Sequence, residues 1–224
     1  VVAAYGKVLP EEILDTPQYG SINVHSSLLP KYRGAAPINW AILNGETETV
    51  VSIMYMAKEL DAGDIILQKT TAIRETENAQ ELTERLAELG AQVLSQAVTE
   101  LTEGKAVRTP QAAEKATYAA MLSREMSTID WNRSAHEISC QVRGLIPWPC
   151  ASTDVIHGEM MKLYAVLEAG EATDAAPGEI VAAGKQGIEI ACGDGKRLRI
   201  LELQAQGGKR MSAAAYLLGH PIQC

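Results

Sequence analysis

The sequence predicts an α/β domain built on an open sheet, followed by a smaller and mostly β domain. Two patterns support this prediction. Up to Gly104, short apolar runs alternate with helical patterns, which is typical of an α/β fold. Beyond residue 150, turn signals recur about every ten residues, which favours a small antiparallel barrel or sandwich.

The elements of the first half can be assigned in order. Residues 1–4, "VVAA", form a continuous apolar run, which predicts a strand buried on both faces of a parallel sheet. Pro37 in the first turn and Gly45 after the last mark 36–44 as a helix. The other expected elements are a short helix at 10–17, strands at 20–25, 49–56 and 64–73, and a long amphipathic helix at 78–103.

The second half follows a segment without clear periodicity at 105–120. "SAHE" at 134–137 is a capping box that opens a helix running to about Arg143, and "MSAAAYLLG" predicts a serine-capped helix near the end. We therefore expect an α/β domain at 1–106, a linker at 107–120 and a β domain at 121–224.

Composition excludes several classes of protein. The 224 residues are 46% hydrophobic and 21% charged, as in an ordinary folded protein, and because there is no Phe, aliphatic side chains must fill the cores. No apolar run approaches the ~20 residues that span a bilayer, so we expect no membrane partner. Four cysteines without a CxxC indicate reduced thiols in a cytoplasmic protein, and four scattered histidines indicate no metal site.

The net charge of −8 argues against nucleic acid as a partner. One segment departs from this balance, because its five basic residues accompany a single acid, Glu202. The basic residues are Lys196, Arg197, Arg199, Lys209 and Arg210. Both a solvated face and a phosphate-binding patch fit this pattern.

A pair of polar residues ends the strand at 20–25. Asn23 and His25 are two apart, so both project from one face, at the carboxyl end where open α/β sheets bind ligands. An amide donates without titrating, and a histidine exchanges a proton near neutral pH. The pair suits a reaction at a carbonyl group, with one group steadying an oxyanion while the other moves a proton. A polar strand end before a tight loop is the alternative interpretation.

Two loops could complete a site. In the first, Ser27 offers a hydroxyl, Leu28 and Leu29 offer apolar surface, and Pro30 stiffens the turn, while Arg33 adds a fixed positive charge. In the second, "ELDAGDIIL", Asp61 and Asp64 flank Gly63 between two apolar strands. This stretch reads either as a plain β-turn or as the source of a carboxylate that orients and charges the imidazole.

Taken together, "INVHSSLLPKYRGAAP" and the later "LDAGD" resemble the folate-dependent formyltransferases, whose catalytic site combines an Asn-x-His, an "SLLP" loop and the Asp of an "LDxG" turn. The resemblance implies that Asn23, His25 and Asp61 are catalytic and that 10-formyltetrahydrofolate donates the formyl group without a metal. It also implies folate contacts for Ser27, Leu28, Leu29 and Pro30 and, through a looser match of "YGKVLP", for Leu9.

Other segments, including "RGAAPINWAILNG", "STIDWNRSAHEI" and "VRGLIPWPCA", resemble the members of that family that formylate initiator methionyl-tRNA. The resemblance makes 1–106 the C-terminal part of a Rossmann-like catalytic domain, and 121–224 a tRNA-binding barrel resembling an OB-fold. It implies phosphate contacts for the basic residues between 196 and 210, and Arg33 either anchors its loop or contacts the tRNA end. We expect a cytoplasmic monomer acting in translation initiation.

Some alternatives stay open. Sister enzymes that formylate a nucleotide sugar or glycinamide ribonucleotide share the three catalytic residues, and a tRNA-binding protein with a degenerate catalytic half is a further alternative. Family members also carry strands and helices before "VVAAYG". We expect the chain to be the remainder of something longer and, if the polypeptide begins at Val1, to have little or no activity.

Overall fold

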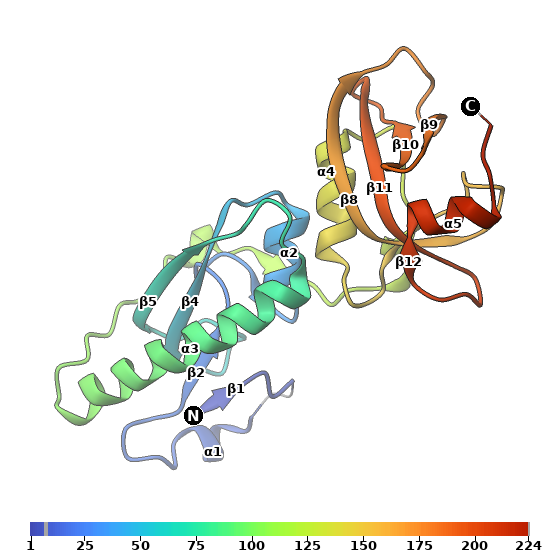
Figure 1. Ribbon diagram of the computed structural model, residues 1–224. Coiled ribbons are helices and arrows are strands. Elements are labelled where there is room, and N and C mark those ends of the chain that lie inside the picture. The colour runs from blue at the N-terminus through green and yellow to red at the C-terminus, as the bar shows by residue number, and fades with distance from the viewer. Residues whose placement is uncertain (7–8, 224) are drawn as a thin grey trace. The chain divides into compact units, whose positions relative to one another are not determined.

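The computed structural model describes residues 1–6 and 9–223, and the chain divides into two compact units (Figure 1). The first unit comprises 1–41, 46–75 and 80–121, and the second comprises 42–45, 76–79 and 122–224. The elements of the first part of the chain are β1 (Val2–Ala3), α1 (Glu11–Leu14), β2 (Ile22–His25), β3 (Arg33–Gly34), α2 (Pro37–Leu43), β4 (Glu48–Tyr55), β5 (Ile65–Ala72), α3 (Ala79–Thr102) and β6 (Tyr118–Ala119). Those of the remainder are α4 (Ala135–Gly144), β7 (Ala151–Thr153), β8 (Met161–Ala172), β9 (Ile180–Gly184), β10 (Gly187–Ala191), β11 (Lys196–Ala205), β12 (Met211–Ser212) and α5 (Ala213–Gly219).

The sheet of the first unit has the order β1-β2-β4-β5 and is mixed. β1 and β2 are parallel, whereas β4 runs antiparallel to both of its neighbours. The expectation of a first strand buried on both faces is wrong, because Val2 is only half-buried and Ala3 is exposed. In the described sheet β1 lies at the edge and pairs with β2 alone.

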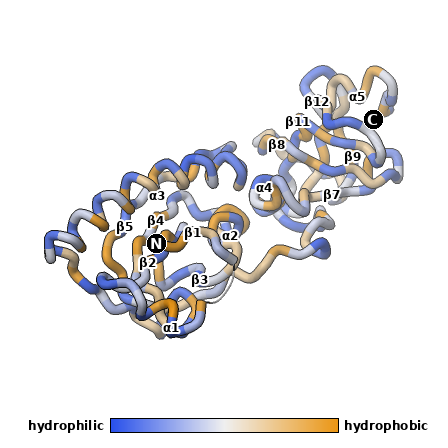
Figure 2. The backbone as a smooth tube through the Cα atoms, turned by 90° about the horizontal axis from the view of Figure 1, so that it is seen from below, coloured by the Kyte–Doolittle hydropathy of each residue, from blue (hydrophilic) through white to orange (hydrophobic). Residues whose placement is uncertain are grey.

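Helix α3 covers the sheet of the first unit and confirms the long helix expected at 78–103. Its apolar side chains recur at helical spacing and are buried, among them Leu82, Leu86 and Val93, and Figure 2 shows apolar and polar segments alternating along it. A Cβ atom added at Gly90 would lie only 3.2 Å from the Val24 side chain, so the glycine allows close helix–sheet packing. No described helix is long and apolar enough to cross a membrane.

The segment at 107–120, which we expected to be a linker, packs against the rest of the first unit. Thr109 and Ile65 exchange two backbone hydrogen bonds of 2.9 and 2.8 Å. Further along, β6 pairs in parallel with β3. Short segments that pair with backbone need no hydrophobic periodicity, which explains why the sequence pattern missed them.

The second unit is an antiparallel β domain, as expected, with strand order β7-β8-β11-β10-β9 and β12 beside β11. Register shifts interrupt the pairing of β8 with β11, which lets both long strands bend. Among the described strands, β7 and β9 lie at the two ends of this order.

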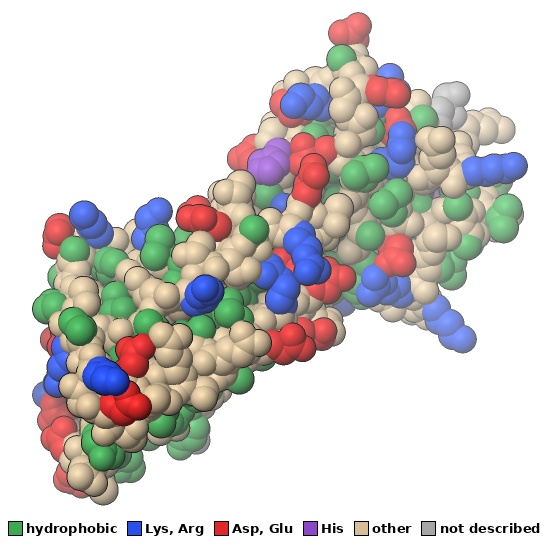
Figure 3. All heavy atoms as spheres, turned by 60° about the vertical axis from the view of Figure 1, so that its left-hand side comes forward, with side chains coloured by type: hydrophobic (Ala, Val, Ile, Leu, Met, Phe, Trp, Pro, Cys, Tyr) green, Lys and Arg blue, Asp and Glu red, His purple; other side chains and the backbone are tan. Residues whose placement is uncertain are grey.

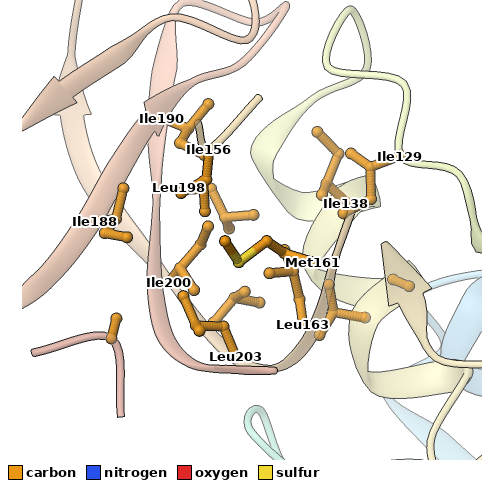
Figure 4. Close-up of a cluster of buried hydrophobic side chains, with 14 of the residues drawn as sticks. Ile129, Ile138, Ile156, Met161, Leu163, Ile188, Ile190, Leu198, Ile200 and Leu203 are labelled. Atoms are coloured by element: carbon orange, nitrogen blue, oxygen red, sulfur yellow. The ribbon is translucent and has the colours of Figure 1, made fainter. Parts of the chain in front are cut away.

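The core of the second unit is almost entirely aliphatic, as the absence of Phe requires. Figure 4 shows the central side chains, which come from α4, from the strands and from the segments between them. They are Ile129, Ile138, Ile156, Met161, Leu163, Ile188, Ile190, Leu198, Ile200 and Leu203.

The capping box expected at 134–137 opens α4. The Ser134 hydroxyl accepts a hydrogen bond from the Glu137 backbone N–H at 3.2 Å, and the Glu137 carboxylate accepts from the Ser134 backbone N–H at 3.0 Å. The Ser134 hydroxyl also donates to that carboxylate at 2.7 Å. The hydroxyl first, and then the backbone N–H, lower the pKa of Glu137 from 4.5 to about 2.

We predict that acid weakens this cap. Because the folded-state pKa lies below 4.5, the ionised carboxylate adds stability above pH 4.5 that is lost as the pH falls toward about 2. A Glu137→Gln variant cannot ionise, so it should lose less stability than the parent over this interval, as measured by urea unfolding at stepped pH. Equal losses in the two proteins would contradict the prediction.

Candidate active site

The imidazole of His25 lies between two oxygen acceptors. It projects from the last residue of β2, opposite Ser52 of β4, and is 6% exposed. Its Nε2 lies 3.0 Å from the Tyr32 carbonyl oxygen, and because a carbonyl only accepts, Nε2 carries the hydrogen. Its Nδ1 lies 3.7 Å from Oδ2 of Asp61. The ring is therefore hydrogen-bonded at Nε2, and its Nδ1 lies within ion-pair distance of a carboxylate.

Asp61 reaches His25 from the loop between β4 and β5. The neck of this loop is closed by a 2.8 Å hydrogen bond from the Tyr55 N–H to the Asp64 carbonyl. Asp61 itself has a φ of +51°, which is uncommon for a residue other than glycine. Its Oδ2 accepts a 2.7 Å hydrogen bond from the Gly34 N–H, on the chain segment that follows His25. The predicted catalytic pair is thus brought together by two loops.

Asn23 lies two residues before His25 on β2 and is half-buried. The alternation of side chains along a strand places the two on the same face of the sheet. Within the described residues no protein group forms a hydrogen bond with the Asn23 amide. The amide is therefore available to a substrate.

In the loop after His25, the Ser27 hydroxyl forms a hydrogen bond within the loop itself. Ser27 donates to the Lys31 carbonyl at 2.7 Å, and its own carbonyl accepts from the Ser52 hydroxyl at 2.6 Å. Leu29 is buried at 3% exposure, whereas Leu28 is 43% exposed. Of the residues expected at the folate, Leu28 offers the most open apolar surface.

The looser part of the folate expectation, "YGKVLP", is only partly described. Leu9 is half-buried, and Lys7 and Val8 lie outside the described residues. One hollow of the first unit has a volume of about 480 Å³ and is lined by residues that include Leu14, Tyr55 and Arg108, but by none of the three predicted catalytic residues.

Arg33 and Gln111 form a buried polar contact beside the predicted catalytic pair. Arg33 is 6% exposed, and its guanidinium donates to the Gln111 side-chain oxygen through Nη2 at 2.8 Å and Nε at 3.2 Å. This inward placement favours the anchoring role of Arg33 over the tRNA contact. Gln111 was missed from the sequence, because it lies in a segment without periodicity.

The five basic residues that we expected to contact tRNA lie on β11 and in the turn after it. Three are paired with acids: Arg197 with Glu171 and Glu189, Arg199 with Glu189, and Arg210 with Glu202. In the described chain, Lys196 and Lys209 are exposed and make no ion pair. On the face drawn in Figure 3, basic side chains lie among acidic ones rather than in one separate patch.

The described residues contain no group of three or more His, Cys, Asp or Glu placed to hold a metal ion. Cys140, Cys150 and Cys192 are free and buried. Burial raises the pKa of the Cys192 thiol to about 12, so it stays protonated at neutral pH.

An imidazole at the end of a strand and a carboxylate from a loop thus meet in an α/β unit, which an antiparallel β domain follows. The family matches show that a chain of this kind is a formyl transferase. Residues 1–98 match the family described as formyl transferase, and residues 121–221 match the formyl transferase C-terminal domain. The chain is 49% identical over 222 residues to the methionyl-tRNA formyltransferase of Caldanaerobacter subterraneus subsp. tengcongensis, covering 99% of this chain and 71% of that protein. The chain belongs to the methionyl-tRNA formyltransferase family.

A second relative supports this assignment, and two solved structures share the fold. The methionyl-tRNA formyltransferase of Bacillus licheniformis is 44% identical over 223 residues, which cover 100% of this chain and 70% of that protein. HypX from Aquifex aeolicus, solved with tetrahydrofolic acid, shares the fold with a TM-score of 0.67 at 22% identity, over 88% of this chain and 34% of that chain. Methionyl-tRNA formyltransferase from Clostridium thermocellum does so with a TM-score of 0.57 at 19% identity, over 74% of this chain and 70% of that chain. The expected family, fold class and enzyme class are confirmed.

Proposed function

We propose that this chain transfers a formyl group from 10-formyltetrahydrofolate to the α-amine of methionine on initiator methionyl-tRNA. One observation carries the proposal: the Asp61 carboxylate lies 3.7 Å from the His25 ring, in a chain 49% identical to a methionyl-tRNA formyltransferase. The tetrahydrofolic acid bound by HypX, which shares the fold, supports a folate as the donor.

The reaction is a direct acyl transfer. The amine nitrogen attacks the formyl carbon, and a tetrahedral intermediate with a negatively charged oxygen forms. The bond from that carbon to N10 of the folate then breaks. The amine loses one proton and N10 gains one, so the protein must stabilise the oxyanion and help to move that proton.

Each catalytic residue has a role that follows from its contacts. The Asn23 amide has no protein partner in the described chain and can donate to the oxyanion. Asp61 orients the His25 ring through Nδ1 and supports its positive charge. Because Nε2 of His25 donates to the Tyr32 carbonyl, the bound substrate must displace that carbonyl before the ring can act on it. Catalytic hydrogen bonds often reach their working geometry only in the complex with substrate.

The tRNA contacts that we propose are those of the two unpaired lysines. Lys196 begins β11, and Lys209 lies in the turn between β11 and β12. A paired arginine such as Arg199 has part of its charge neutralised, here by Glu189, and therefore attracts a phosphate less strongly. Lys196 and Lys209 therefore carry the electrostatic part of the binding in the second unit.

A formyl-transfer assay tests both parts of the proposal. We expect label from 10-formyltetrahydrofolate to appear on methionyl-tRNA, and a Lys196→Ala/Lys209→Ala variant to raise KM for the tRNA with kcat unchanged. The salt dependence of tRNA binding should also fall, by about one unit of log–log slope for each phosphate contact removed.

A Lys185→Ala variant is the control for losing an exposed lysine outside 196–210, since Lys185 lies in the turn between β9 and β10. It should leave both KM and the salt slope unchanged. Equal effects of the two variants would contradict the assignment of Lys196 and Lys209, and transfer to an amino sugar nucleotide in preference to methionyl-tRNA would contradict the acceptor.

A further inference from the structure

We propose that Gln111 is a positioning residue that holds the Asp61 loop against His25. The proposal rests on the proposed function of Asp61, and it assigns a role to a segment that the sequence presented as a linker.

The side chain of Gln111 binds both sides of the site. Its Nε2 donates to the carbonyl oxygens of Asp61 at 2.8 Å and Gly63 at 2.7 Å. Its Oε1 accepts from the guanidinium of Arg33, eight residues after His25 in the chain. One amide therefore ties the loop that carries Asp61 to the segment that follows the histidine.

The Asp61 loop needs such a tie. Asp61 has a φ of +51°, a conformation that persists only where the surroundings impose it. Two carbonyl oxygens of the loop converge on the one Gln111 nitrogen. The charge of Arg33 polarises the Gln111 amide and strengthens its hydrogen bonds to those carbonyls.

The same segment also fixes the loop on the His25 side. The Thr117 side-chain oxygen accepts from the Tyr32 N–H at 2.9 Å, and the Thr117 carbonyl accepts from the Arg33 N–H at 2.9 Å. The Tyr32 carbonyl in turn accepts from His25. Residues 109–119 thus form a brace across both halves of the catalytic pair, with Gln111 as its contact to Asp61.

Gln111→Glu is the sharpest test, because it keeps the size of the side chain and an acceptor for Arg33. It replaces the N–H donors that reach Asp61 and Gly63 with a carboxylate oxygen, and it adds one negative charge beside Arg33. Gln111→Met is a second variant that lacks both donor and acceptor. The matched control is Gln141→Glu in the second unit, where Gln141 Nε2 likewise donates to two carbonyls, those of Met126 at 2.8 Å and Thr128 at 3.0 Å.

Amide hydrogen exchange reports whether Asp61 stays in place, and it does not require an active enzyme. The Gly34 N–H donates to Asp61 Oδ2 at 2.7 Å, so its exchange rate reports whether the carboxylate stays in place. We expect Gln111→Glu to speed exchange of this amide about tenfold, the effect of losing a hydrogen bond to a charged group. The neighbouring Arg33 N–H, bound to Thr117, should keep its parental rate.

Three exchange results would overturn the proposal. In the first, the Gly34 rate is parental in both Gln111 variants. In the second, the Gly34 and Arg33 amides accelerate alike, which indicates general loosening of the fold. In the third, Gln141→Glu accelerates Gly34 as much as Gln111→Glu does.

A double-mutant cycle on kcat then connects the brace to the chemistry. Gln111→Glu should lower kcat about 10- to 100-fold in the parent, since misplacing a catalytic group is costly. In an Asp61→Ala background the same change should cost less than about twofold, because the group it positions is gone. Full additivity would show that Gln111 does not act through Asp61. If Asp61→Ala alone leaves kcat unchanged, the proposed function of Asp61 fails, and the exchange result still decides whether Gln111 holds the loop.

Discussion

Replacing His25 or Asp61 with alanine is expected to lower kcat for formyl transfer by about 10²–10⁴, with the fold retained. The two groups face each other at 3.7 Å and are largely withdrawn from water. His25→Ala removes the ring that carries the charge and the proton, and Asp61→Ala removes the carboxylate that orients it. Because the groups act as a unit, the double variant should be little slower than the worse single variant.

The second unit offers a matched control for this prediction. His136 Nδ1 and Glu168 Oε1 form a histidine–carboxylate pair of 2.9 Å, but both side chains are well exposed. His136→Ala should leave kcat within about twofold of the parent, since exposed pairs of this kind contribute little. Suppose that His25→Ala and Asp61→Ala melted at the parental temperature and lowered kcat no more than His136→Ala does. Both residues would then be turn residues and not catalytic ones.

Elements with a strong local pattern could be predicted from the sequence. The long helix at 78–103 is found at Ala79–Thr102, because its apolar side chains recur at helical spacing. The capping box at Ser134 and Glu137 carries its own hydrogen bonds, so its chemistry is fixed within four residues. Such signals do not depend on the rest of the fold.

Features that depend on distant neighbours could not be predicted. The "VVAA" run has the composition of a buried strand, but its burial depends on which strands flank it, and β1 has one neighbour in the described sheet. The pairing of β6 with β3 leaves no period in 107–120, since it involves two residues on each side. Long-range backbone pairing of this kind has no local signature.

In the candidate site, too, only the features with a local sequence signal could be predicted. Strand alternation alone places Asn23 and His25 on one face. The approach of Asp61 could not be derived from the local sequence, because β4 runs antiparallel to β2 and the loop must turn back to reach His25. The family resemblance indicated that Asp61 belongs to the site. Neither the local sequence pattern nor the resemblance indicated Gln111.

Gly63→Ala is expected to be the most damaging single-methyl change in the site. An added Cβ would overlap the Tyr55 carbonyl oxygen and lie 2.8 Å from the Tyr55 carbonyl carbon. Both are backbone atoms at the neck of the Asp61 loop, so no side chain can move aside. We expect a loss of about 3 kcal/mol in the free energy of unfolding, measured by urea denaturation. The fall in kcat should match that of Asp61→Ala, because the loop cannot keep both its neck and its carboxylate in place.

A second glycine shows whether the damage comes from this site or from the change of residue. At Gly184, at the end of β9, an added Cβ meets nothing within 4 Å and the backbone is not left-handed. Gly184→Ala should therefore unfold at the parental urea concentration or slightly above it, since alanine lowers the entropy of the unfolded chain. If Gly63→Ala behaved like Gly184→Ala, the neck would be looser than the contact between Gly63 and Tyr55 requires. The loop could then not hold Asp61 in one place, and the case for a preorganised carboxylate beside His25 would fail with it.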